Sequence, residues 1–144
     1  MCSSDLQGAQ GTLGNQGIQG IQGITGGLTG TITFSEGSSI PSAAAIDDYA
    51  INDAAFYKIS GTTASNINGF SNGSSGRFII IANNTNKNQT FNQEATSSSA
   101  SNRFVLGVAN KTIGVNQTAT FIYLTGLTVG GSGSQSRWVL TSNT

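Results

Sequence analysis

Hydrophobic and polar positions along residues 29–144 alternate over short distances and show no sustained period of 3.6 residues. Short apolar or alternating runs are separated by clusters of Asn, Gly and Ser, which are residues that turns require. Eight strands are predicted, at residues 31–35, 55–60, 77–83, 89–93, 103–106, 112–115, 118–125 and 136–141. The pattern predicts an all-β head at residues 29–144, folded as a two-sheet β-sandwich or a jelly roll.

Two segments of the head have no strand pattern. Residues 42–46, a run rich in alanine after Pro41, are too short to change the fold class, so we expect a turn or a single helical loop there. Residues 130–134 contain only Gly and Ser, which predicts a flexible loop before the last strand.

Two predicted strands are apolar on both faces. Residues 78–81 read Phe-Ile-Ile-Ile and residues 121–124 read Phe-Ile-Tyr-Leu. One face of each strand would line the core, and the other can be buried only by a loop or by another subunit. We therefore expect Phe78, Ile80, Phe121 and Tyr123 to contribute to a subunit interface.

Glycine recurs at every third position near the start of the chain, at Gly8, Gly11, Gly14, Gly17, Gly20, Gly23 and Gly26. Only glycine fits the crowded axis where three polyproline-II-like chains wind together. Residues 7–28 therefore predict a collagen-like Gly-X-Y stem, preceded by a tail at residues 1–6, in a homotrimer. The repeat has no proline and no charge, so these few triplets would not hold three chains together alone. The head must supply the trimer.

Two alternatives for residues 7–28 remain open. Gly-rich segments also serve as flexible linkers, although linkers seldom carry isoleucine at a fixed offset as Ile18, Ile21 and Ile24 do. The segment could also be an extended strand that is donated to a neighbouring subunit.

Charge and hydropathy exclude several classes of partner. The 144 residues hold six Lys and Arg against six Asp and Glu, so no basic surface is expected to bind nucleic acid. The longest apolar run, residues 78–82, is far shorter than a membrane helix. The first residues lack the basic and apolar segments of a secretory signal, so either export is not needed or the sequence begins after the true start.

Candidate chemistry is sparse. The chain has no histidine and a single cysteine, Cys2, so the usual metal and nucleophile constellations lack their side chains. Asp47, Asp48 and Asp53 form an acidic cluster that could hold calcium or provide paired carboxylates, but turn capping is the favoured role. We expect no enzyme activity, no metal and no cofactor.

Two further groups of side chains could contact a partner. Arg77, Arg103 and Arg137 each precede an aromatic residue, where they are expected to mark the point at which a strand leaves solvent. Carbohydrate binding would use Tyr49, Tyr57 or Tyr123.

Short phrases along the head carry a family resemblance: TFSEGS at 33–38, DYAI at 48–51, FYKISG at 56–61, GRFI at 76–79, NRF at 102–104 and SRWVL at 136–140. With the glycine repeat, they resemble the heads of collagen-like fibre and decoration proteins of tailed bacteriophages. The layout is also similar to bacterial collagen-like surface filament proteins. The resemblance implies a homotrimeric, non-enzymatic virion component.

The expected function is that of a self-assembling fibre or capsid decoration subunit on a virion surface. Its partners would be its own copies and a capsid or tail protein. The alternatives are the repeating subunit of an extracellular filament, in which the N-terminal segment docks into the next head as a helical polymer, and an adhesin that binds a cell-surface glycan.

Overall fold

Strands account for almost all regular structure in residues 33–144, the part of the chain that the computed structural model describes. A single three-residue 3₁₀ helix, η1 (Ala100–Asn102), interrupts them. The all-β class predicted from the sequence is therefore confirmed. The predicted tail and stem, with all seven in-phase glycines, lie outside the described residues.

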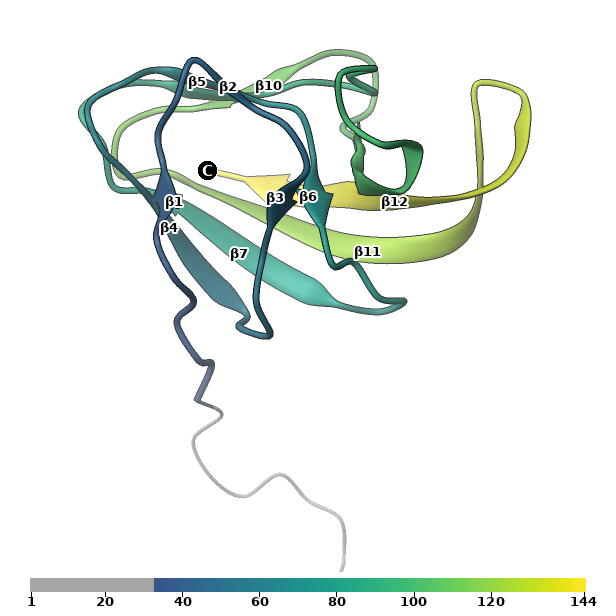
Figure 1. Cartoon of the computed structure of the whole chain (residues 1–144), viewed down its shortest axis with the longest axis horizontal. Helices are drawn as coiled ribbons and strands as arrows, with labels where there is room; N and C mark the ends of the chain where they lie inside the picture. The colour runs from purple at the N-terminus through teal and green to yellow at the C-terminus, as the bar shows by residue number, and fades with distance from the viewer. Residues whose placement is uncertain (1–32) are drawn as a thin grey trace, which may run out of the picture. The chain divides into compact units, whose positions relative to one another are not determined.

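The strands form three sheets (Figure 1). The largest has the order β1 (Ile40–Pro41), β4 (Phe56–Ser60), β7 (Phe78–Asn83), β11 (Thr118–Val129), β12 (Ser132–Asn143) and β9 (Phe104–Val105). The second has the order β10 (Lys111–Ile113), β8 (Gln89–Phe91), β5 (Ser65–Ile67) and β2 (Ala45–Ile46). The third pairs β3 (Tyr49–Ala50) with β6 (Phe70–Ser71).

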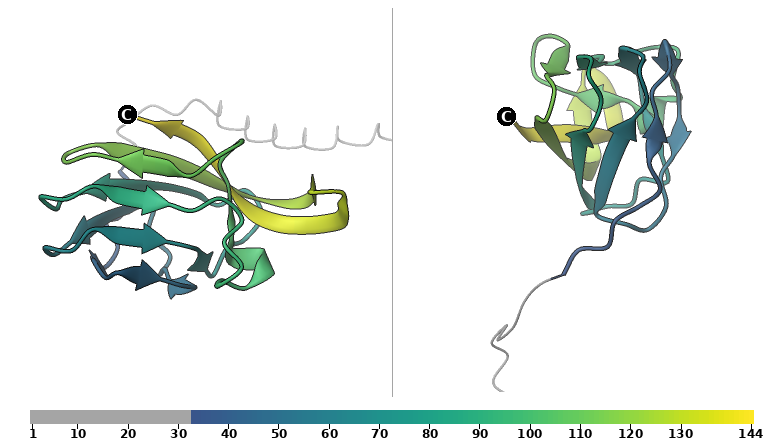
Figure 2. Two further views of the ribbon diagram at one scale, coloured as in Figure 1. Left: turned by 90° about the horizontal axis from the view of Figure 1, so that it is seen from above. Right: turned by 90° about the vertical axis from the view of Figure 1, so that its left-hand side faces the viewer.

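Successive strands wind as the coils of a short β-solenoid. The chain passes from β1 through β2 to β3, then repeats this path through β4, β5 and β6, and starts it again through β7 and β8. Equivalent strands of successive coils pair in parallel, so Ile46, Ile67 and Phe91 lie in register. Figure 2 shows these strands stacked upon one another. Each coil places its apolar residues on those of the next, which builds one continuous core.

A polar ladder follows the same stacking. Asp47, Asn68 and Asn92 come directly after the stacked apolar residues of their coils. The Asn68 amide donates to Asp47 Oδ1 at 2.7 Å, and the Asn92 amide donates to Asn68 Oδ1 at 2.6 Å. These bonds satisfy polar groups at the turn of each coil and fix the coils in register.

The connectivity departs from the predicted jelly roll. Jelly rolls are antiparallel, whereas six of the nine strand pairs among the described residues are parallel. Two principal sheets around one core remain, as a sandwich requires. The difference arises because each strand pairs with its equivalent one coil later and not with the strand that follows it in the chain.

An antiparallel hairpin covers the last coil. Strand β11 pairs with β7, and β12 pairs with β11. The flexible loop predicted at residues 130–134 is instead a two-residue turn, in which Gly130 and Gly131 have φ values of 59° and 75°. Both residues need positive φ in a type I′ turn, which suits the twist of a hairpin.

Two other predictions at the start of the head are corrected. Residues 33–35 form no strand, and only an isolated bridge joins Glu36 to Phe56. Residues 42–46 contain β2 and no helical turn, because Ala45 and Ile46 pair with β5. Residues 31 and 32 of the predicted first strand lie outside the described residues.

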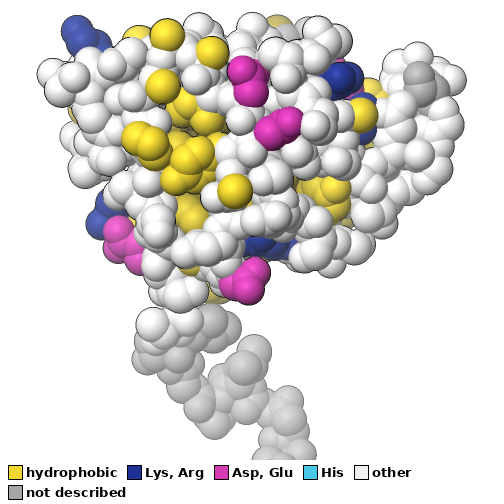
Figure 3. Space-filling view, in the orientation of Figure 1, with side chains coloured by type: hydrophobic (Ala, Val, Ile, Leu, Met, Phe, Trp, Pro, Cys, Tyr) yellow, Lys and Arg dark blue, Asp and Glu magenta, His cyan; other side chains and the backbone are white. Residues whose placement is uncertain are grey.

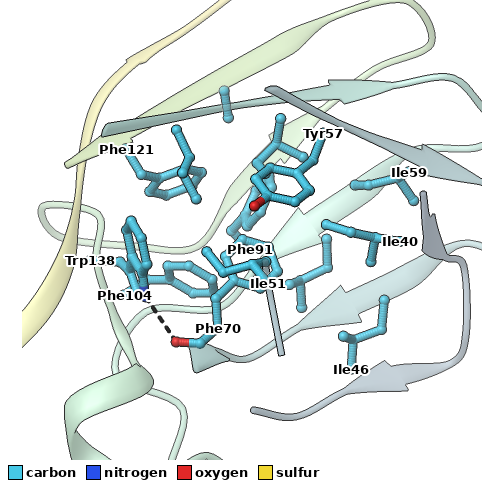
Figure 4. Close-up of a cluster of buried hydrophobic side chains, with 14 of the residues drawn as sticks. Ile40, Ile46, Ile51, Tyr57, Ile59, Phe70, Phe91, Phe104, Phe121 and Trp138 are labelled. Carbon is cyan, nitrogen blue, oxygen red and sulfur yellow. Dashed lines mark hydrogen bonds between the residues drawn. The ribbon is translucent and has the colours of Figure 1, made fainter. Parts of the chain in front are cut away.

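Aromatic rings fill one end of the core (Figure 4). Phe70, Phe91, Phe104, Phe121 and Trp138 are all buried from solvent. Phe70 packs edge-on against Phe104 and Trp138, with ring centroids 5.2 and 6.5 Å apart. The Trp138 indole Nε1 donates to the Phe70 carbonyl at 2.8 Å, so the one polar atom of this ring is satisfied.

Among residues 33–144, no helix is long and apolar enough to cross a membrane.

Candidate assembly surface

The predicted interface residues divide between the two faces of the largest sheet. Phe121 and Tyr123 are 0% and 5% exposed and pack inside the chain's own core, so their assignment to a subunit interface is wrong. Because Phe121 pairs with Ile79 and Ile122 with Phe78, the outward residues of these strands are Phe78, Ile80 and Ile122. The sequence of the two four-residue apolar runs could not show which of their residues face outward, since every position in them is hydrophobic.

The outward residues form an apolar surface on β4, β7 and β11. Phe56 of β4 pairs with Ile80, and Phe78 pairs with Ile122, so these four side chains lie side by side on one face. Phe78 is 41% exposed, and the other three are partly buried. The one charge on this face of β4, Lys58, is 2.8 Å from Glu36 and is therefore neutralised.

This surface continues into a groove of about 510 Å³ at the start of β4 and β7. Phe34, which is 56% exposed, lines the groove together with Phe78. Residues 33–35 therefore lie beside the exposed sheet face as the chain joins the head. We define the outer apolar surface as Phe34, Phe56, Phe78, Ile80 and Ile122.

Polar contacts hold the loops beside the groove. The Arg77 guanidinium donates to the carbonyl oxygens of Asn52 and Asn72 and to Tyr57 Oη. The Tyr57 hydroxyl donates to the Ala54 carbonyl at 3.1 Å. Burial raises the pKa of Tyr57, although the nearby Arg77 charge opposes the shift. The network joins the two loops, at residues 52–54 and 72–77, that line the groove.

The acidic residues act as turn ligands. The Asp48 carboxylate accepts from the Ser99 backbone N–H at 2.9 Å, the Ser99 hydroxyl at 2.6 Å and the Asn102 amide at 3.0 Å. Asp47 accepts from Asn68 and Ser97. These bonds attach the loop around η1 to the first coil, while Asp53 lies apart and lines the groove. Within residues 33–144, no three His, Cys, Asp or Glu side chains gather as a metal site would require.

Asp48 makes the stability of the head dependent on pH. Burial alone would raise the pKa of Asp48, but the hydrogen bonds from Ser99 and Asn102 outweigh it and lower the pKa below the ordinary carboxyl value. The folded state therefore favours the charged form. Its contribution is present above about pH 4, the pKa of an unfolded aspartate, and is lost as pH falls through the folded pKa.

The variant Asp48→Asn tests this contribution. We expect it to lower the free energy of unfolding by about 1 kcal/mol at pH 7, because its amide can accept fewer of these bonds. Urea denaturation should show the deficit shrinking as the pH falls below about 4, because the unfolded parent then becomes protonated before the folded one. Asp53→Asn, at an exposed position, is the control and should change little at either pH. A deficit that persists unchanged at pH 3 would contradict the assignment.

The tyrosines offer little to a sugar. Tyr57 and Tyr123 are 1% and 5% exposed, and only Tyr49 of the three is partly exposed. A second groove, of about 630 Å³, lies between the β11–β12 turn and the loop around η1. Its lining includes Glu94, Arg103 and Arg137 but no aromatic ring. Glycans commonly stack on aromatic faces, and of the three predicted tyrosines Tyr49 alone is accessible to one.

Arg137 has a structural role that the sequence did not indicate. It is 3% exposed, and its Nε and Nη2 donate to the two carboxylate oxygens of Glu94 at 2.7 and 3.0 Å. Its remaining contacts are the Gln135 side chain and the Ser136 carbonyl. Arg103 donates from Nε to the Ser98 carbonyl at 2.8 Å. Both arginines hold the loop around η1 against the largest sheet.

Comparison with protein-family models, curated proteins and solved structures gave no match. The function must therefore be inferred from the sequence and the geometry of the head.

Proposed function

We propose that the chain is a non-enzymatic structural subunit that assembles as a homotrimer. Residues 7–28 form a collagen-like stem and residues 29–144 form the head. The observation that carries this proposal is the set of seven glycines at three-residue spacing, from Gly8 to Gly26, because only a shared triple-helical axis requires that pattern. The exposed Phe34 and Phe78 support it, since a lone head would leave them in water.

The assembled trimer would serve as a fibre or decoration on a virion surface. A low charge and a head rich in Ser, Thr, Asn and Gly suit a component that packs against copies of itself and a capsid or tail protein.

A second candidate is the repeating subunit of an extracellular filament, and the first coil favours it. Strands β1 and β2 stand at the edges of their sheets, where an extended segment of another copy could pair. Pro41 and Ala45 are exposed on these strands and Ala50 is exposed on β3, and Figure 3 shows hydrophobic side chains gathered between β1 and β3. Mass measurement and negative-stain images would separate the two: discrete trimers support the first, and open helical polymers support the second.

Substitution in the stem tests the trimer directly. Gly17→Ala should lower the melting temperature of the assembly, because a methyl group cannot enter the triple-helical axis. Gln16→Ala, beside it but off the axis, is the control and should melt close to the parent. The measurement is a thermal melt followed by circular dichroism near the collagen signal and by light scattering. Equal melting of Gly17→Ala and the parent would favour a linker or a donated strand.

A further inference from the structure

We propose that the three heads contact one another through the outer apolar surface, which comprises Phe34, Phe56, Phe78, Ile80 and Ile122. The partner is a second copy of this chain. The inference rests on the proposed homotrimer and adds the surface through which the head supplies it.

The segment between the glycine repeat and the head is short, which limits how far apart the three heads of a trimer can lie. Thr33 follows Gly26 by seven residue steps, and at about 3.5 Å per step they reach roughly 25 Å at most. Three chains on one triple-helical axis must therefore join their heads within that distance of the axis. Domains of this size have a radius of gyration of about 13 Å, so three heads joined so closely lie side by side.

The surface beside this junction is the one that is suited to contact. Four large hydrophobic residues among 33–144 are notably exposed, at Phe34, Phe78, Val108 and Val115. Phe34 and Phe78 line one groove and continue onto the sheet face, whereas Val108 and Val115 lie on separate loops outside the strands. The exposed aromatic area is thus concentrated where the chain joins the head.

The chemistry of the surface fits a copy of itself. Phe56, Phe78, Ile80 and Ile122 carry no charge, and Lys58 beside them is paired with Glu36. Asp53 and Arg77, which also line the groove, carry opposite charges, so the surface as a whole has no net charge that would repel the same surface of a neighbouring head around a threefold axis. Since the sequence of the short stem contains neither proline nor a charged residue, the heads must contribute to the association.

The test uses the full chain and two matched substitutions. Phe78 and Val115 are 41% and 48% exposed, so Phe78→Glu and Val115→Glu place the same charge at positions of similar exposure. Light scattering coupled to size exclusion should show trimers for the parent and for Val115→Glu. The Phe78→Glu trimer should dissociate to monomers at a protein concentration at least tenfold higher than the concentration at which the parent trimer dissociates. Its circular dichroism should remain that of a folded β protein.

A second variant distinguishes the loss of the contact from misfolding of the head. Phe34 belongs to no strand, so Phe34→Glu leaves the sheet intact and should weaken the trimer in the same direction. Trimers of parental stability in both variants would overturn the surface while leaving the homotrimer in place. A monomeric parent would overturn the homotrimer itself, and with it this contact. Open polymers of the parent, unaffected by Phe78→Glu, would assign assembly to the first coil instead.

Discussion

Replacing Trp138 with alanine is expected to lower the free energy of unfolding of the head by about 3–5 kcal/mol, the range for large aromatic residues in packed cores. The ring is fully buried and contacts both Phe70 and Tyr123 edge-on. Its loss leaves a cavity and removes the donor to the Phe70 carbonyl. Because β12 carries Trp138 and pairs with both β9 and β11, the loss weakens three strands together.

Urea denaturation followed by circular dichroism measures this effect. Val139→Ala, on the next residue but on the opposite, partly buried face, is the matched control and should cost about 1 kcal/mol. If the two variants unfold at the same urea concentration, the indole is not the centre of the core.

Glu94→Gln is expected to cause the second largest decrease in the free energy of unfolding, about 3 kcal/mol, because it leaves the buried Arg137 charge without its carboxylate. The pair is bidentate, and Arg137 is almost completely shielded from water. Glutamine keeps the length of the side chain but removes its charge, so the cost is that of the unpaired guanidinium. Chemical denaturation at low and high salt gives the measurement, and a buried pair should respond little to salt.

The same substitution at an exposed pair provides the control. Glu36 and Lys58 lie 2.8 Å apart with half-exposed side chains, so Glu36→Gln should cost less than about 1 kcal/mol. The double variant Glu94→Gln with Arg137→Met should recover part of the loss, because no buried charge remains. Equal losses at Glu94 and Glu36 would show that solvent reaches the guanidinium.

The sequence predicted the β class and the positions of the long strands because their apolar runs are continuous. It did not predict the parallel stacking, since a strand shows no direction of pairing in its own residues. A signal was present: Ile46-Asp47-Asp48-Tyr49 and Ile67-Asn68-Gly69-Phe70 share an order of apolar, polar and aromatic residues, and they stack in register. Such a repeated order of residues is the sequence signature of stacked coils.

The assembly surface was half predictable. The apolar runs at 78–81 and 121–124 predicted strands with two apolar faces, which the structure shows, but a period of two cannot assign inward and outward faces when all positions are hydrophobic. Phe34 was not identified as a surface residue because residues 31–35 were predicted to form a strand. The pairing of Arg137 with Glu94 joins residues far apart in the chain, so no local pattern could reveal it.

Because the head is wound in coils, its length along the stack can change by whole coils. Each coil repeats the lateral positions of the one before, and the Asp47, Asn68 and Asn92 side chains hold neighbouring layers together by the same kind of bond. Duplication of a segment of roughly 20 residues would add one layer and lengthen the stack by about 4.8 Å, with the closing hairpin unchanged. A lineage built on this plan can therefore vary its reach by whole layers while keeping both ends intact.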